Sequence, residues 1–588
     1  MTRPIFIALL LATACEIDEA KDTTSDTPTD TDTDTDTDSD ADTDVDTDTD
    51  TDTDTDIDVP ETCPEGLADL AIATWDGCVT GRVADGVEGF LGIPYAQPPV
   101  DALRWAPPQD PVPWTDPRSG LDKGSACIQT HGTLDFDLGA LDGDEDCLYL
   151  NVMRPEGTQP GDDLPILFWV HGGSHVDGSG GQGVMLDASF GNPSNDPPLF
   201  EAAPNLPSDD VIVVTHNYRL GPLGFLSHPG MEPDFAAGGL GNQGLLDTHK
   251  ALEWVKANAV ALGGNPDRIV GFGQSAGSVS LCTLLTVDGI DDLLAGAILM
   301  SGTCQQVRED AAGEDGLQGY GQGARVADNL GCGSGTPAEQ LDCMRSRPGT
   351  EVVSRGQGQL WGWDFNSEAY GPVVDGGFVD VPTVEDFAAG NVPDIDVVLG
   401  FTRDESTIFT VFAPVQSRAE LELLLAGVAV IFGWPVAGLQ DLYDPADFGN
   451  DPQRAYDAAA TELLFACPTR DQARRLQPHV ASVHGYRWDK PIGLLPDFGA
   501  FHGVEIGYVF GTGLLLGDEA RMSETAIDAW RAAADGSFTV DGVVWPLLDV
   551  DGVDERWLGF DVGAAPIGVF DGAERCDWMD AQGWYWDR

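Results

Sequence analysis

Short apolar runs alternate with helix-like segments along residues 61–588. The runs are residues 164–170 (LPILFWV), 211–215 (VIVVT), 268–272 (RIVGF), 297–300 and 397–400. Helix-like segments, such as residues 244–260 and 276–285, lie between them. Apolar strands that alternate with helices are typical of a parallel sheet covered on both faces. We therefore predict an α/β fold with a mostly parallel central sheet flanked by helices, and look for chemistry at the carboxyl ends of its strands.

The residues before this region have a composition that cannot form a core. Residues 29–58 carry Asp at every even-numbered position, mostly in alternation with Thr. As a strand, this pattern would align like charges on one face and leave nothing apolar to bury, so nothing offsets the ordering entropy. We predict a disordered acidic tether over residues 15–60 and one large domain over residues 61–588.

Residues 1–14 have the pattern of a signal peptide. Arg3 precedes an apolar run from Ile5 to Ala14, and small residues end that run. Cys15 follows directly, so two interpretations stay open. A lipoprotein peptidase would leave a lipid on Cys15 and anchor the protein to a membrane, whereas an ordinary signal peptidase would release a secreted protein.

Charge and hydropathy exclude two classes of protein. The chain has 99 Asp and Glu against 29 Lys and Arg, a formal net charge of −70. Binding to nucleic acid needs a basic surface, which this composition does not offer. Beyond residue 15 no apolar run approaches the roughly 18 residues that a membrane-spanning helix needs. Eleven cysteines fit an exported protein with disulfides, because ten remain to pair if Cys15 carries lipid.

Residues 273–277 (GQSAG) have the G-x-S-x-G pattern, directly after the RIVGF run and before a helix-like segment. Strand, sharp turn and helix are the setting of a nucleophile elbow, in which the two glycines avoid collisions with neighbouring backbone. Ser275 is therefore the candidate nucleophile. A Ser hydroxyl needs a general base, normally a His that a carboxylate orients.

On this fold class the acid and then the His follow the Ser along the chain. Three histidines lie far enough downstream, and we expect His479 and His484 to be structural because they lie in helix-like and strand-like segments. His502, in a Gly-containing loop, is the candidate base. Asp404 and Glu405 both follow the run at residues 397–400, and spacing alone does not choose between them.

The oxyanion of the reaction needs donors that are already in place. Residues 171–174 (HGGS) directly follow the LPILFWV run. The backbone N–H groups of Gly173 and Ser174, together with that of Ala276 after the nucleophile, are the candidate oxyanion donors.

Four longer motifs, in order, resemble the type B carboxylesterase family, which includes the cholinesterases. They are residues 92–99 (GIPYAQPP), 145–152 (EDCLYLNV), 217–221 (NYRLG) and 241–247 (GNQGLLD). The resemblance implies an α/β-hydrolase fold and no metal or cofactor. Its Gly-x-x-x-Asp-Glu and His-Gly-x-Glu patterns assign the acid to Glu405 and the base to His502. It also implies buried structural ion pairs between Arg104 and Glu145 and between Arg219 and Asp247.

The family's disulfides correspond here to Cys127 with Cys147, Cys332 with Cys343, and Cys467 with Cys576. We add Cys63 with Cys78 from their proximity in the chain. We expect Cys282 to be a buried free thiol, and Cys304 has no assigned partner.

Two departures from the family bear on the substrate. Gln274 stands where Glu commonly precedes the nucleophile, and no Trp lies between Cys127 and Cys147, where cholinesterases use one to bind a quaternary ammonium. We therefore expect an exported serine carboxylesterase that hydrolyses neutral short- to medium-chain esters through an acyl-enzyme. The alternatives are a long-chain lipase and a catalytically inactive esterase-like binding or adhesion protein. The oligomeric state is left open.

Overall fold

The computed structural model describes most of the region after the acidic repeat. The described residues are 62–64, 70–130, 141–181, 206, 210–305, 307, 311–312, 319–356, 370–411, 413–512, 515–550 and 555–584. The predicted signal peptide and tether lie outside these residues, as do most residues of the Cys127–Cys147 loop that lacks Trp.

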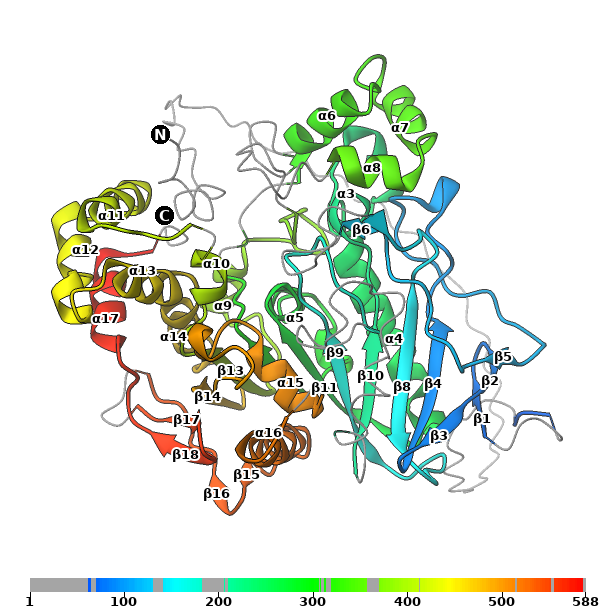
Figure 1. Ribbon diagram of the computed structural model, residues 1–588. Coiled ribbons are helices and arrows are strands. Elements are labelled where there is room, and N and C mark those ends of the chain that lie inside the picture. Colours follow the sequence, from blue (N-terminus) through cyan, green and yellow to red (C-terminus); the bar gives the residue numbers. More distant parts are fainter. Residues whose placement is uncertain are drawn as a thin grey trace, which may run out of the picture.

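An 11-stranded sheet forms the centre of the molecule (Figure 1). In spatial order its strands are β18 (Ala564–Ile567), β17 (Trp557–Phe560), β14 (Ser482–Trp488), β13 (Asp396–Thr402), β12 (Gly296–Met300), β11 (Gly264–Gln274), β9 (Leu164–Val170), β10 (Ile212–His216), β8 (Tyr149–Pro155), β4 (Val87–Pro94) and β3 (Arg82–Ala84). From β10 to β17 every neighbouring pair is parallel, and antiparallel pairs occur only toward the two edges. The prediction of a mostly parallel sheet is confirmed, and each of the five apolar runs lies in a strand apart from Val211, which precedes β10.

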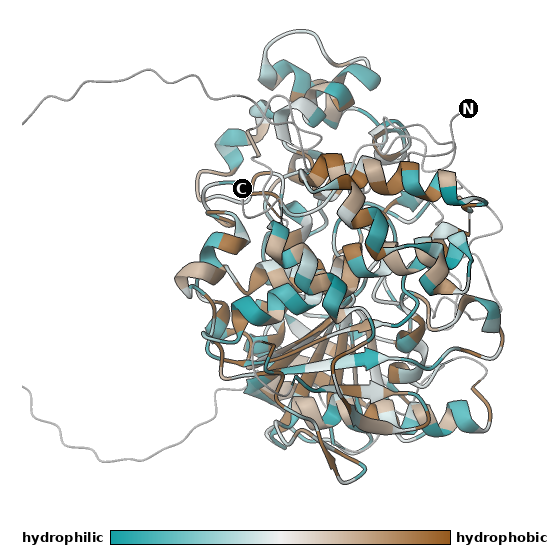
Figure 2. Ribbon diagram, turned by 90° about the vertical axis from the view of Figure 1, so that its left-hand side faces the viewer, coloured by the Kyte–Doolittle hydropathy of each residue, from teal (hydrophilic) through white to brown (hydrophobic). Residues whose placement is uncertain are grey.

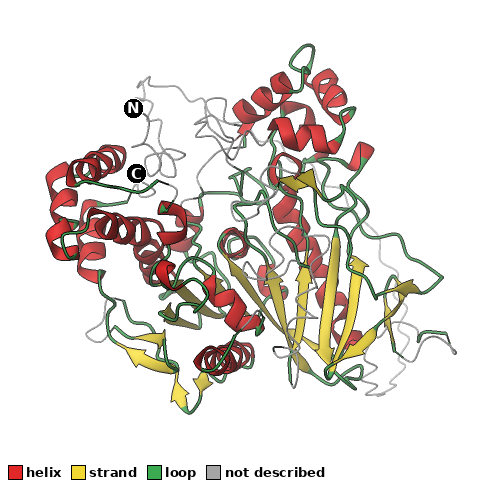
Figure 3. Ribbon diagram, viewed as in Figure 1, coloured by secondary structure: helices red, strands yellow, loops and turns green. Residues whose placement is uncertain are grey.

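The two faces of the sheet belong to two hydrophobic cores. Side chains alternate between the faces of a strand. On β9, Ile166 and Phe168 join one core, and Leu167 and Trp169 join the other. Helices α4 (Gln243–Leu262) and α5 (Ala276–Leu284) contribute to the first core, and α15 (Val504–Phe510) and α16 (Asp518–Ala534) contribute to the second. Figure 3 shows helices in front of and behind the sheet, and Figure 2 shows mostly hydrophobic residues along its strands.

Further helices extend from this framework. They are α3 (Gly221–Gly224), α6 (Gly319–Asn329), α7 (Pro337–Arg345), α8 (Gly349–Gly356), α9 (Thr383–Ala389), α10 (Thr407–Thr410), α11 (Arg418–Phe432), α12 (Val436–Leu442), α13 (Pro452–Thr461), α14 (Cys467–Leu476) and α17 (Ala573–Gln582). A π-helix, Glu462–Ala466, connects α13 to α14. Among the described residues, no helix combines the length and apolar character that crossing a membrane requires.

Five disulfides link described cysteines. Four of them join Cys63 to Cys78, Cys127 to Cys147, Cys332 to Cys343, and Cys467 to Cys576. The fifth joins Cys282 to Cys304.

The prediction that Cys282 is a free thiol is therefore wrong. Cys282 lies on α5, which follows β11, and Cys304 lies in the loop after β12. These neighbouring strands run parallel with Gln274 opposite Met300, so the segments that follow them leave the same edge of the sheet. That arrangement brings the two Cα atoms within 5.7 Å, although 22 residues separate them in the chain.

Candidate active site

The turn between β11 and α5 holds Ser275 in an unusual backbone conformation. Its φ of +55° lies in the left-handed region, which side chains other than glycine rarely adopt. The Ser275 N–H donates to the carbonyl of Met300 on β12 (2.9 Å). Strain of this kind persists only where neighbouring structure holds it, and it is concentrated at functional sites.

The two glycines of the turn have no room for side chains. A Cβ on Gly273 would lie 2.6 Å from the carbonyl oxygen of Gly277, and one on Gly277 would lie 2.0 Å from that of Val170. These contacts press the start of α5 against the end of β9. The glycines are therefore required by the close approach of two backbones, as the sequence pattern indicates.

The loop after β9 packs directly against this turn. A Cβ on Gly172 would lie 3.1 Å from the Cβ of Ser275, and Gly173 has a φ of +108°. Further along the loop, Nε2 of His175 forms a hydrogen bond with Oγ of Ser280 on α5 (2.9 Å). The loop that carries Gly173 and Ser174 is thus fixed beside α5, whose first residue is Ala276.

His502 lies in the loop that precedes α15, and Glu405 follows β13. Nδ1 of His502 and Oε2 of Glu405 are 2.6 Å apart, and both side chains are buried. The other oxygen of Glu405 accepts the N–H of Thr402 (2.7 Å), and the Glu405 carbonyl accepts the N–H of His502 (3.3 Å). The carboxylate is therefore oriented from two sides, and the imidazole presents Nε2 away from it.

The neighbouring carboxylate, Asp404, has different partners. Its Oδ2 accepts the N–H of Ala500 (2.8 Å) and pairs with Arg403 (2.8 Å). Asp404 thus binds the backbone of the loop that carries His502, whereas Glu405 binds the imidazole itself.

Two further polar side chains lie next to this pair. Nε2 of Gln274 is 3.2 Å from Nε2 of His502, so the residue before the turn contacts the imidazole. On α15, burial raises the pKa of Glu505 well above its ordinary value, and the nearby Glu405 raises it further. Burial and the proximity of Glu405 thus both favour the protonated form of Glu505.

The buried histidines at 171, 175 and 216 have hydrogen-bond partners of their own. Nδ1 of His171 lies 2.8 Å from the Gly172 carbonyl oxygen, and Nδ1 of His216 lies 3.0 Å from that of Trp169. Burial lowers the pKa of His171 to about 4 and the pKa values of His175 and His216 to about 3, which makes all three weaker bases than an ordinary imidazole. Nδ1 of His484 forms a hydrogen bond with the carbonyl of Pro546 (3.0 Å), and His479 packs near Gly390. His484 lies on β14, and His479 lies in the turn between α14 and β14.

Two aromatic rings flank His502, and sequence patterns do not reveal them. The ring centroids of Phe409 and Phe465 lie 5.3 and 4.9 Å from that of the imidazole. Phe409 follows Glu405 by one helical turn, a local signal that could have found it. Phe465 comes from a helix that precedes His502 by 37 residues, so only the tertiary fold brings it here.

The two ion pairs implied by the family resemblance are present; the Arg219–Asp247 pair is buried, and the Arg104–Glu145 pair is partly buried. Nη2 of Arg219 lies 2.7 Å from Oδ1 of Asp247, and Nε of Arg104 lies 2.6 Å from Oε2 of Glu145. Arg104 also donates to the carbonyls of three residues near the end of α7. These bonds give Arg104 a structural role that does not involve the candidate active site.

Comparison with known proteins gives consistent matches. The family model described as the carboxylesterase family matches residues 68–537. The para-nitrobenzyl esterase of Bacillus subtilis is 31% identical over 489 residues, with 81% of this chain and 92% of that protein covered. The fumonisin B1 esterase of Sphingopyxis macrogoltabida is also 31% identical, with 82% of each chain covered. A solved structure of a PNB esterase, which has the α/β-hydrolase fold, superposes with a TM-score of 0.70 at 27% identity, covering 87% of this chain and all of that one.

Proposed function

The chain belongs to the carboxylesterase family and has the α/β-hydrolase fold, and from this premise we propose that it is an exported serine carboxylesterase acting through an acyl-enzyme. The observation that carries the proposal is the 2.6 Å contact between His502 and Glu405 at the same end of the sheet as the strained turn at Ser275. Nucleophile, acid and base follow one another along the chain in the order of this fold.

In the proposed first step, Oγ of Ser275 attacks the carbonyl carbon of the ester. Nε2 of His502 takes the Ser275 proton, since Nδ1–H is committed to Glu405. The imidazolium then returns that proton to the leaving alkoxide, and the acyl group remains on Ser275. Water, activated by the same imidazole, releases the acid in the second step.

The tetrahedral intermediates would carry a negative oxygen between the loop after β9 and the start of α5. We propose that the backbone N–H groups of Gly173, Ser174 and Ala276 donate to it. Donors that are fixed before the reaction need no reorganisation as charge develops, which is why such sites lower the barrier. The packing of Gly172 against Ser275 supports this placement.

Hydrolysis of nitrophenyl esters from acetate to palmitate tests the proposal. We expect activity that is highest on the short and medium chains, and Ser275→Ala should lower kcat/KM by a factor on the order of 10³ or more while folding normally. A preference for palmitate would favour the lipase alternative. No hydrolysis of any chain length by the folded protein would favour an inactive binding protein.

Neutral esters are the proposed substrates. Gln274 places an uncharged amide beside His502 where a carboxylate would attract a cation.

Export is proposed from the predicted signal peptide and is supported by the five disulfides, which form in oxidising compartments. We further propose that Cys15 carries a lipid and that residues 15–60 are a spacer. Mass spectrometry of the mature N-terminus tests the anchor, and an unacylated Cys15 would leave a secreted enzyme.

A further inference from the structure

The peptide group between Glu405 and Ser406 is hydrogen-bonded at both ends. Its carbonyl oxygen accepts the N–H of His502 (3.3 Å), and its N–H donates to Oγ1 of Thr461 (3.2 Å). Ser406 and Thr461 are buried, and among the described residues the structure gives this N–H no other acceptor. Because a buried N–H that loses its acceptor is costly, the Thr461 hydroxyl fixes the orientation of the peptide group.

This peptide group belongs to the candidate acid. The side chain of Glu405 accepts the N–H of Thr402 (2.7 Å) and contacts Nδ1 of His502 (2.6 Å). Backbone and side chain of Glu405 therefore both bind His502, and a rotation of the peptide group would disturb the two contacts together. The carboxylate must stay within hydrogen-bond reach of Nδ1 to hold the imidazole in the required tautomer.

The π-helix Glu462–Ala466 forms a single π-turn that fixes Thr461 from the other side. Thr461 is the last residue of α13 and directly precedes this turn. Glu462 accepts the hydroxyl of Tyr443 (2.8 Å) and Nε–H of Arg575 on α17 (2.6 Å). Glu462 and Tyr443 are buried, so Thr461 follows directly from a neighbour that is firmly held.

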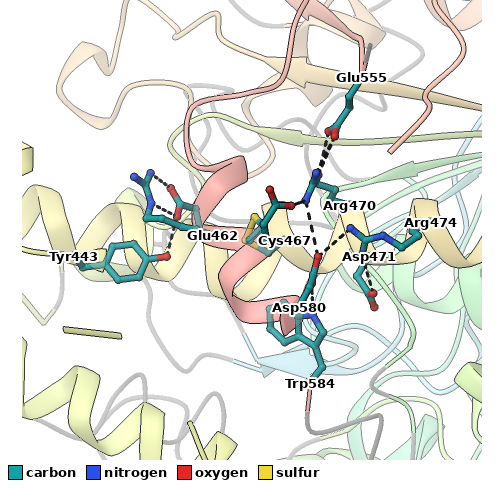
Figure 4. Close-up of a disulfide and its surroundings, with 12 residues drawn as sticks. Tyr443, Glu462, Cys467, Arg470, Asp471, Arg474, Glu555, Asp580 and Trp584 are labelled. Atoms are coloured by element: carbon teal, nitrogen blue, oxygen red, sulfur yellow. Dashed lines mark hydrogen bonds and ion pairs between the residues drawn. A yellow bond between two sulfur atoms is a disulfide. The ribbon is translucent and has the colours of Figure 1, made fainter. Parts of the chain in front are cut away.

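The other end of the π-turn is also tied down, and Figure 4 shows the contacts at both ends. Directly after the turn, Cys467 is joined to Cys576 on α17. Three residues further along, Arg470 pairs with Glu555 (2.9 Å), and both side chains are buried, so water does not weaken this charge-assisted bond. Movement of the π-turn would break these contacts, so the hydroxyl that binds the peptide group is held in place before substrate binds.

We propose that Thr461 is a positioning residue for the candidate acid. Its hydroxyl fixes the peptide group between Glu405 and Ser406, and thereby the carboxylate that orients His502. Thr461 acts through the backbone of Glu405 and not on the reacting atoms. This inference rests on the proposed function. Misplacement of a catalytic group by about 1 Å can cost on the order of 10² in rate, so one hydrogen bond behind the acid is enough to affect turnover.

Three substitutions test the hydroxyl. Thr461→Val keeps nearly the same shape without an acceptor, Thr461→Ala also lacks the acceptor, and Thr461→Ser retains it. With nitrophenyl acetate, we expect the first two to lower kcat about tenfold, about 1.4 kcal/mol, with KM within twofold of wild type. Thr461→Ser should keep kcat within twofold. Circular dichroism checks folding, and if Thr461→Val does not fold, the comparison of Thr461→Ala with Thr461→Ser decides.

A double-mutant cycle with Glu405→Gln separates positioning from general damage. Glu405→Gln already removes the carboxylate that Thr461 positions. In that background, Thr461→Val should therefore lower kcat by less than twofold, whereas general damage to the fold would lower it about tenfold in both backgrounds.

Thr410→Val is the matched control. The buried Thr410 hydroxyl on α10 donates to Oδ1 of Asp457 on α13 (2.6 Å). Thr410→Val therefore removes a hydroxyl from the same interface between helices and leaves the bond between Ser406 and Thr461 in place. Its kcat should stay within twofold of wild type.

Three results would overturn the inference. They are a folded Thr461→Val or Thr461→Ala variant with wild-type kcat, additive losses in the double-mutant cycle, and a loss in Thr461→Ser or Thr410→Val as large as that in Thr461→Val. A folded wild-type protein that hydrolyses no ester would instead refute the proposed function itself.

Discussion

The backbone of Ser275 adopts a conformation that is unfavourable for any residue with a side chain. Contacts of Gly273 and Gly277 with neighbouring backbone, and the hydrogen bond to Met300, hold it there. The strain is inherent in the backbone and is independent of the hydroxyl, so removal of that hydroxyl should affect chemistry and leave folding intact.

At the same scale, the two adjacent carboxylates should differ in effect. Glu405→Gln should lower kcat/KM by a factor on the order of 10³ to 10⁴, because an amide does not hold the imidazole in the required tautomer. Asp404→Asn should cost less than about tenfold, since Asp404 binds the loop backbone at Ala500 and not the imidazole. Steady-state kinetics on nitrophenyl acetate, with circular dichroism as a folding check, measure both. Equal losses in two well-folded variants would contradict the choice of Glu405.

Glu505 gives a prediction about stability and pH. Its pKa is raised in the folded chain, so above about pH 4.5 the unfolded chain releases a proton that the folded chain retains. This group therefore makes the free energy of unfolding fall as pH rises through that range, by up to about 1.4 kcal/mol per pH unit. Glu505→Gln removes the effect, so the variant should gain stability relative to wild type as pH rises.

Urea unfolding at pH 4.5, 5.5 and 6.5 measures the difference in the free energy of unfolding between Glu505→Gln and wild type. Glu574→Gln is the matched control, because the Glu574 side chain is exposed in the folded chain, and its difference from wild type should be nearly constant. A difference for Glu505→Gln that does not vary with pH would mean that Glu505 is ionised in the folded protein.

At the scale of elements, the disulfides close loops of very different length. Cys467–Cys576 spans 109 residues and ties α14 to α17, whereas Cys332–Cys343 spans 11 residues. In the chain-entropy model a long loop constrains the unfolded chain more than a short one does. The helices around the π-turn therefore depend on a long-range link.

Removing each of these two bonds by paired Cys→Ala substitutions should give unequal losses. We expect loss of Cys467–Cys576 to lower the free energy of unfolding by about 2 kcal/mol more than loss of Cys332–Cys343. Urea titration of the two double variants under identical conditions measures this difference in the free energy of unfolding. A larger loss from the short loop would show that native-state contacts, rather than chain entropy, dominate both effects.

The net negative charge of the whole molecule opposes the proposed preference of the site for neutral esters. Residues 62–588 have a formal charge of −51, which attracts cations over long distances at low salt. Near 0.15 M ionic strength the Debye length falls to about 8 Å, so the groups beside the substrate dominate.

Acetylcholine and its uncharged isostere 3,3-dimethylbutyl acetate separate the two effects. Near 0.15 M salt, kcat/KM should be higher for the uncharged ester, because Gln274 offers no charge to a cation and no Trp lies between Cys127 and Cys147. Lower salt should raise the value for acetylcholine selectively. A tenfold excess for acetylcholine near 0.15 M, about 1.4 kcal/mol, would mean that another side chain supplies a cation site.

Much of the fold follows from local patterns. The run at residues 164–170 predicts β9 to the residue, and the run at residues 268–272 lies within the longer β11. Apolar runs and glycine spacing depend on residues that are close together in the chain, so they can be interpreted from a single sequence. The candidate triad also follows from ordered motifs, and the structure brings His502 and Glu405 into contact.

The sequence by itself determined the parallel sheet, the turn at Ser275 and the order of the candidate site residues, because these depend on periodicity and on motifs a few residues long. Only the tertiary structure decided that Cys282 pairs with Cys304, that Gln274 contacts His502, and that Phe465 flanks the imidazole. The physical reason is that these contacts join segments whose approach depends on strand order and on a π-turn anchored from α17. For each contact, the residues of one segment do not indicate which distant segment will lie beside it.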